Sequence, residues 1–208
     1  MRNLIIRTRA PARAAARGFT LLELMVTLSI AAVLVAIAAP NLRNIIRNGE
    51  LAATANDVIH SLQLARTEAI KRQRPVVWCA STNPLAALPT CAIGAPVGWI
   101  VFQDNVGNQQ TAAGDPIIER HDFVSADITI RGDGSGVQSY TALGFAAPPA
   151  GAFVPTRNVV FCDSRGNVPI GTSSTARALF IAATGRARVS ALFADVTQAL
   201  VNIGTTCP

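Results

Sequence analysis

The sequence predicts an α+β fold in which one long N-terminal helix packs on an antiparallel β-sheet domain. Residues 19–39 are a largely apolar run, and residues 40–73 continue with apolar positions three and four apart. After residue 75, short β-rich runs alternate with turn residues. The 208 residues allow one ordinary domain. Half of them are apolar and 14% are charged, which excludes global disorder and indicates a membrane-embedded part.

The positive charge is concentrated at the N-terminus. Five of the 18 basic residues precede residue 18, and no acidic residue does. Without these five, the chain has 13 basic and 12 acidic residues, a net charge of +1. The net charge of +6 therefore comes largely from this leader. An anion-binding site would therefore have to come from a local patch.

The apolar run 19–39 is long enough to span a membrane. Twenty-one residues in a helix cover about 31 Å, close to the ~30 Å of a bilayer core. The preceding arginines should keep the N-terminus in the cytoplasm. The run could be an ordinary signal anchor, or a secretory signal cleaved near Ala36-Ile37-Ala38, although it is longer than a usual signal core. Neither reading explains Glu23, a costly carboxylate within the run.

The remaining elements follow in order. Residues 40–73 predict the amphipathic second half of the helix, which ends before Pro75 because the residue preceding a proline avoids helical geometry. A single antiparallel sheet is expected from the residues after it. Its strands are predicted at 76–80, 98–103, 117–121, 128–131, 158–162, 178–183 and 187–193, with loops at 81–97 and 144–157.

The chain has four cysteines: Cys79, Cys91, Cys162 and Cys207. They form no CxxC pair, so no metal site is expected. An even number in an exported chain predicts two disulfides. Three pairings are possible; we prefer Cys79 with Cys91, across a short loop, and Cys162 with Cys207, which would tie down the C-terminus.

Enzymatic activity and a cofactor are not expected. His60 and His121 lie near no recognisable nucleophile motif, and G-x-S-x-G is absent. The glycine-rich stretch 132–136 lacks the lysine and the following helix of a phosphate loop.

The segment Arg17-Gly18-Phe19-Thr20-Leu21-Leu22-Glu23 resembles the prepilin peptidase site of type IV pilins and type II secretion pseudopilins. This resemblance implies cleavage after Gly18 and methylation of Phe19. It also implies that Glu23 pairs with the N-terminal amine of a neighbouring subunit, which would explain the buried charge.

The same resemblance implies a type IV pilin-like fold and divides the chain into four parts. These are a prepilin leader (1–18), a transmembrane helix (19–39), the second half of the pilin helix (40–73) and a periplasmic β domain (74–208). Before assembly, the protein would cross the bacterial inner membrane once; afterwards it would lie in the filament. Its implied partners are prepilin peptidase and other pilins or pseudopilins.

Four further segments resemble the FimT/GspH group of minor pilins and pseudopilins: 64–72, 98–102, 161–166 and 184–189. The group implies a minor pilin of a type IV pilus, with a role in priming assembly. The alternative is an H-type minor pseudopilin of a type II secretion system. A membrane-anchored periplasmic enzyme or binding domain is a third reading, and it predicts no cleavage at Gly18.

Gly185-Arg186-Ala187-Arg188 is the candidate binding segment. On a strand, Arg186 and Arg188 face one side about 6.8 Å apart, close to two phosphate steps of ~3.4 Å. Arginine's rigid fork suits phosphate. Two exposed arginines are, however, most often solvated or paired, here with Asp195 or Asp163.

The same segment resembles the GRxR motif of FimT, which in that group is linked to DNA binding in natural transformation. The resemblance implies double-stranded DNA as a partner. Arg177 and Arg165 would join the site if the fold brings them near.

Overall fold

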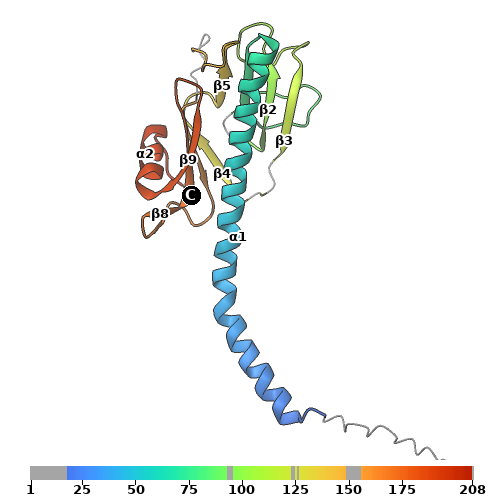
Figure 1. Ribbon diagram of the computed structural model, residues 1–208, viewed down its shortest axis with the longest axis vertical. Helices are drawn as coiled ribbons and strands as arrows, with labels where there is room; N and C mark the ends of the chain where they lie inside the picture. Colours follow the sequence, from blue (N-terminus) through green and yellow to red (C-terminus); the bar gives the residue numbers. More distant parts are fainter. Residues whose placement is uncertain (1–17, 93–95, 123–124, 126, 149–155, 208) are drawn as a thin grey trace, which may run out of the picture. The chain divides into compact units, whose positions relative to one another are not determined.

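The computed structural model describes residues 18–92, 96–122, 125, 127–148 and 156–207 (Figure 1). The predicted leader, apart from Gly18, lies outside these residues. The chain divides into two compact units, residues 1–44 and residues 45–208, and each is described by itself. The first long element, α1 (Leu21–Arg72), runs through both of them.

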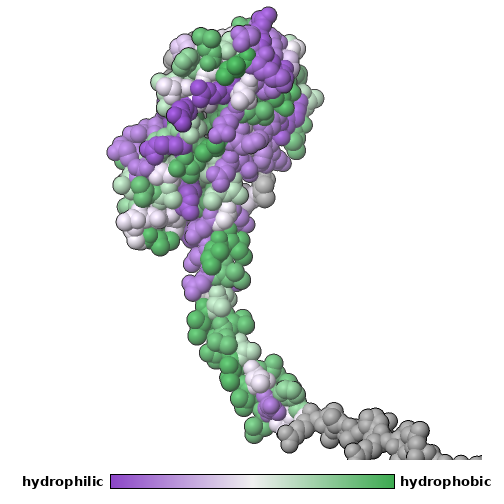
Figure 2. Space-filling view, in the orientation of Figure 1, coloured by the Kyte–Doolittle hydropathy of each residue, from purple (hydrophilic) through white to green (hydrophobic). Residues whose placement is uncertain are grey.

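In the first unit, α1 is largely apolar, with Glu23 as the charged residue within the run 19–39. Among the described residues, α1 is the one helix that is long and apolar enough to cross a membrane. Figure 2 shows hydrophobic side chains covering this stretch, and Leu22, Met25 and Ile30 are all more than half exposed. An apolar surface of this extent marks a region that contacts lipid or other helices.

In the second unit, α1 buries one continuous stripe of side chains. The stripe consists of Leu51, Ala55, Val58, Leu62, Ala65 and Ala69, which are at most 1% exposed. Their alternating spacings of four and three place them on one helix face. The three alanines let the backbone of α1 approach the sheets closely.

The C-terminus of α1 is capped by a backbone hydrogen bond. Gln73 adopts a left-handed conformation (φ 55°), and the Arg74 N–H donates to the Ala69 carbonyl at 3.3 Å. This is the hydrogen bond of a Schellman motif, here formed without the usual glycine. The chain then turns directly into the first strand.

Two antiparallel sheets pack on α1, where the sequence had led us to expect one. The first has the order β3-β2-β1-β5; the second has the order β4-β6-β8-β7, with β9 also paired to β8. Trp78 and Val101 of the first sheet share a core with Phe161 and Leu179 of the second. The strands are β1 (Val76–Ser81), β2 (Gly98–Gln103), β3 (Ile117–Asp122), β4 (Thr129–Gly132), β5 (Val137–Tyr140), β6 (Asn158–Cys162), β7 (Pro169–Ile170), β8 (Ser173–Ile181) and β9 (Ala187–Leu192).

A second helix, α2 (Phe193–Ile203), follows β9. The sequence predicts a strand as far as Phe193, which is wrong at its end: β9 stops at Leu192 and Phe193 begins the helix. The usual start signal is missing, because Leu192 occupies the N-cap without a side-chain hydrogen bond. Tertiary packing supplies the stability instead: Val196, Ala199 and Leu200 are buried against the face of the second sheet that is turned away from the core shared with α1 (Figure 1).

Two disulfides join the four cysteines. Cys79 pairs with Cys91 and Cys162 pairs with Cys207, with Cα atoms 5.5 and 5.6 Å apart. This is the pairing preferred from the sequence. The second disulfide ties the segment after α2 to the end of β6.

We expect the disulfide that closes the longer loop to stabilise the domain more. In the chain-entropy account, the 45-residue separation of Cys162–Cys207 is worth about 4 kcal/mol and the 12-residue separation of Cys79–Cys91 about 3 kcal/mol. Urea denaturation of the two Cys→Ala double variants measures the difference. A larger loss in the Cys79–Cys91 variant would contradict this account.

Candidate functional site

The candidate arginines follow the tight turn between β8 and β9. The Gly185 N–H donates to the Ala182 carbonyl at 2.8 Å, and the Ala182 N–H donates to the Arg186 carbonyl at 2.9 Å. Gly185 has φ 81°, the left-handed conformation that three-residue hairpin loops require. A Cβ at this position would also lie 2.9 Å from the Tyr140 ring. Glycine is therefore needed both for backbone conformation and for space.

Arg188 is exposed, but its guanidinium contacts two neighbouring side chains. Its guanidinium lies 4.3 Å from the centre of the Phe180 ring, and its Nη1 lies 3.2 Å from Asp195 Oδ2. Hydrogen bonds from Ser190 and then from Arg188 lower the pKa of Asp195. The pairing with Asp195 that the sequence left open is thus present, and its partner belongs to α2.

Two further arginines, Arg157 and Arg66, lie beside the same turn. Arg157 lines a groove of about 480 Å³ together with Phe180, Arg186 and Arg188. Arg157 Nη1 also donates to the Ala182 carbonyl in the turn at 3.2 Å. Arg186 also lines a smaller hollow of about 150 Å³, together with Arg66, Tyr140 and Gly185.

We call Arg66, Arg157, Arg186 and Arg188 the arginine surface. Among the described residues, no carboxylate forms an ion pair with Arg66, Arg157 or Arg186. Burial raises the pKa of the Tyr140 hydroxyl, and the charges of Arg66 and Arg157 act on it in the opposite direction. The surface thus carries four positive charges and one paired carboxylate.

Sequence reasoning missed Arg66 and Arg157. Arg66 belongs to the predicted helix, and Arg157 lies in a stretch read as a loop. No local pattern distinguishes them from other surface arginines, because only the fold brings them to the β8–β9 turn.

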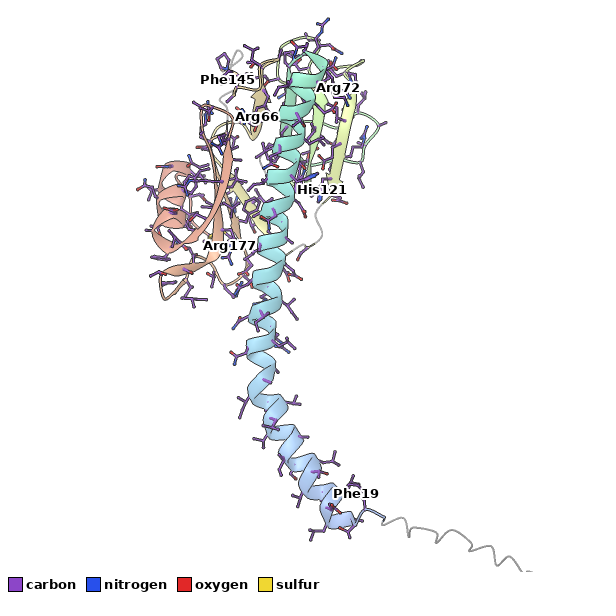
Figure 3. The ribbon with its side chains drawn as sticks, in the orientation of Figure 1. Phe19, Arg66, Arg72, His121, Phe145 and Arg177 are labelled. Atoms are coloured by element: carbon purple, nitrogen blue, oxygen red, sulfur yellow. A yellow bond between two sulfur atoms is a disulfide. The ribbon has the colours of Figure 1, made fainter. Side chains whose placement is uncertain are left out.

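Arg177 lies elsewhere, on the opposite face of β8. It is opposite Phe161 in the β6–β8 register, and Phe161 belongs to the core shared with α1, whereas Arg188 is opposite Phe180. Arg177 Nη1 donates to the carbonyls of Ser174 and Ala176, and Figure 3 labels the residue well apart from Arg66 and Phe145. The structure therefore does not bring Arg177 together with Arg186 and Arg188.

Arg165 binds Asp163 and Asn48, and it does not face the β8–β9 turn. Its Nε lies 3.1 and 2.9 Å from the two oxygens of buried Asp163, and its Nη2 donates to Asn48 Oδ1 at 2.9 Å. Burial alone would raise the pKa of Asp163, but the hydrogen bonds and charge of Arg165 outweigh it and lower that pKa. Arg165 thereby fixes the turn after β6 to α1 and takes no part in the arginine surface.

The predicted processing site stands at the start of α1. Gly18 and Phe19 are exposed and precede the helix (Figure 3). The Glu23 N–H donates to Thr20 Oγ1 at 3.2 Å, so Thr20 caps the helix and Glu23 occupies the third helical position of a T-x-x-E capping sequence. A carboxylate in the first turn also complements the helix dipole.

Two protein families match the sequence. The family described as Type II transport protein GspH matches residues 54–185, more than half of the chain, and the Prokaryotic N-terminal methylation motif matches residues 13–39. No curated protein sequence matches significantly.

Two solved structures are similar, both crystal structures of the type IV minor pilin FimU from Pseudomonas aeruginosa strain PAO1 in different space groups. Each is 20% identical with a TM-score of 0.43. The matches cover 68% and 67% of this chain, and 89% and 92% of the FimU chains.

Replacing Gly185 with alanine should destabilise the domain more than the same change at Gly171. Both glycines have positive φ, which costs alanine roughly 1–2 kcal/mol, but a Cβ at Gly171 meets nothing within 4 Å. The overlap with Tyr140 adds to the cost at Gly185 alone. Thermal unfolding of the two variants checks this order, and equal losses would show that the Tyr140 contact is unimportant.

Proposed function

The chain belongs to the GspH family, and from this premise we propose that it is a minor pilin of a type IV pilus whose arginine surface binds DNA during uptake. Members of this family are structural pilins or pseudopilins, so the reading as a membrane-anchored enzyme is set aside. The methylation motif implies processing by prepilin peptidase and assembly with other pilins.

The observation that carries the DNA proposal is the shared groove of Arg157, Arg186 and Arg188. Guanidinium groups that line one groove suit a row of phosphates. Contacts of this kind go to the nucleic-acid backbone, so binding would be independent of sequence and strongly dependent on salt. Because Arg177 lies on the opposite face of β8, we leave it out of the proposed surface.

The assembly proposal concerns the start of α1. Before assembly, the first unit would cross the inner membrane with the N-terminus in the cytoplasm and the β domain in the periplasm. Its exposed apolar side chains support this placement, as do the disulfides, which need an oxidising compartment. In the filament, Glu23 would pair with the methylated amine of Phe19 from a neighbouring subunit, which offsets the cost of its charge.

An H-type minor pseudopilin of a type II secretion system is the second candidate. It is favoured by the description of the matching family, Type II transport protein GspH. Deletion of the gene separates the two candidates. Loss of pili and of DNA uptake with normal secretion supports the pilus; accumulation of secreted proteins in the periplasm, with pili intact, supports the secretion system.

Prepilin peptidase should cut the chain between Gly18 and Phe19 and so remove the leader. We expect intact-mass spectrometry of the protein from cells with prepilin peptidase to show a chain beginning at methylated Phe19. Gly18→Val should retain the leader, whereas Ala16→Val should be processed normally. A chain beginning after Ala38 would instead indicate a secretory signal, and an uncut chain an ordinary anchor.

Binding of duplex DNA should weaken when Arg186→Gln and Arg188→Gln are combined. Each lost phosphate contact makes the plot of log affinity against log salt concentration less steep by ~0.9. The slope of the double variant should therefore be smaller in magnitude by about 1.8. The measurement is fluorescence anisotropy of the mature full chain in nonionic detergent, from about 50 to 200 mM salt. Arg131→Gln, an exposed arginine on β4, is the matched control. An unchanged slope would contradict the proposal.

A further inference from the structure

A second turn, formed by residues 141–145 after β5, lies against the arginine surface. It is closed by the Thr141 N–H, which donates to the Phe145 carbonyl at 2.9 Å, and by the Gly144 N–H, which donates to the Thr141 carbonyl at 2.8 Å. A Cβ at Gly144 would lie 3.2 Å from Arg66 Nε, and a Cβ at Gly185 would lie 3.0 Å from the Gly144 carbonyl. The turn therefore touches both α1 and the β8–β9 hairpin.

This turn carries an exposed aromatic ring on Phe145, the residue after Gly144, whose position lies against Arg66. Phe145 is 53% exposed. Among the described Phe, Trp and Tyr residues of the second unit, it is the one that is more than half exposed. Trp78, Trp99 and Tyr140 are buried. Figure 3 shows Phe145 and Arg66 close to the same end of α1. An exposed phenylalanine forgoes the stabilisation that burial would provide.

We propose that Phe145 is a stacking platform for an unpaired base, so that the arginine surface binds single-stranded DNA and frayed ends more tightly than continuous duplex. This inference rests on the proposed DNA-binding function and specifies its substrate. Proteins that bind single strands combine a positively charged track for the backbone with aromatic side chains on which bases stack. Arg66, Arg157 and Arg186 supply the track, and Phe145 supplies the ring.

The positive charge around this turn suits a nucleic acid. Exposed Leu143 on the turn and exposed Ile70 against Gly144 make a contact to another pilin the competing explanation, which the test below separates. Here the turn that carries Phe145 lies directly against Arg66 and the β8–β9 turn, and Arg66 and Arg186, with no carboxylate partner among the described residues, line one hollow. A base has an apolar face and a phosphate close by, which matches this combination. In a continuous duplex the bases are already stacked on one another, so Phe145 would add nothing.

The test compares three DNA ligands on the mature full chain in nonionic detergent. They are a labelled oligothymidylate, a blunt duplex of the same length, and that duplex with an unpaired 3′ extension. We expect Phe145→Leu, which keeps the apolar bulk and removes the ring, to weaken single-strand binding about five- to tenfold or more and to leave blunt-duplex binding nearly unchanged. Phe145→Trp should retain the wild-type preference.

Leu143→Ala is the matched control, because Leu143 is 74% exposed on the same turn but carries no ring. It should change single-strand affinity by less than about twofold, since no stacking is lost. Unfolding temperatures equal to wild type establish that each variant folds.

The other outcomes overturn the inference and remain distinguishable. If Phe145→Leu binds single strands as wild type does, while the Arg186/Arg188 double variant weakens both ligands, the stacking role fails and DNA binding stands. In that case Phe145 is better explained as a contact to another pilin. If the wild-type chain binds neither ligand at low salt, the proposed DNA function fails and the stacking role fails with it.

Discussion

The packing of α1 against two sheets is the contact on which the second unit depends. A single stripe of side chains, from Leu51 to Ala69, contributes to a core that contains strands of both sheets. A polar link reinforces it: Trp99 Nε1 donates to Ser61 Oγ at 2.8 Å, and Ser61 Oγ donates to Glu119 Oε1 at 2.8 Å. His121 stacks on Trp99 with ring centres 3.9 Å apart. This packing brings Arg66 of α1 beside the β8–β9 turn.

The sequence was most informative where the signal is local. The spacing of apolar residues and the Pro75 boundary predict α1, and alternating β-rich runs predict most of the strands. The division into two sheets was not predictable, because it depends on hydrogen bonds between segments far apart in the chain. The helix α2 was missed because its start lacks a side-chain cap, although Val196, Ala199, Leu200 and Ile203 have helical spacing and Gly204 ends it with φ 74°.

The candidate site shows the same division between local and distant information. The placement of Arg186 and Arg188 on one side of a strand follows from alternation alone. The sequence left Asp195 and Asp163 open as partners, and the fold selects Asp195 for Arg188. The neighbours Arg66 and Arg157 could not be found from the sequence, because the packing of α1 and β6 brings them to the β8–β9 turn. Local spacing, together with the resemblance to the GRxR motif, identified the two arginines, and the fold determined which arginines lie beside them.

The Cys162–Cys207 disulfide has a mechanical consequence. Arg186 lies between these two cysteines in the chain, so it belongs to a closed covalent ring. A pull on Arg186 relative to α1 is shared by the two arms of that ring, one through β8 and the other through β9 and α2. The β8–β9 hairpin cannot then be drawn out as a single extending strand. A subunit that is pulled through this hairpin resists with two parallel tethers, and reduction of one bond would leave it with one.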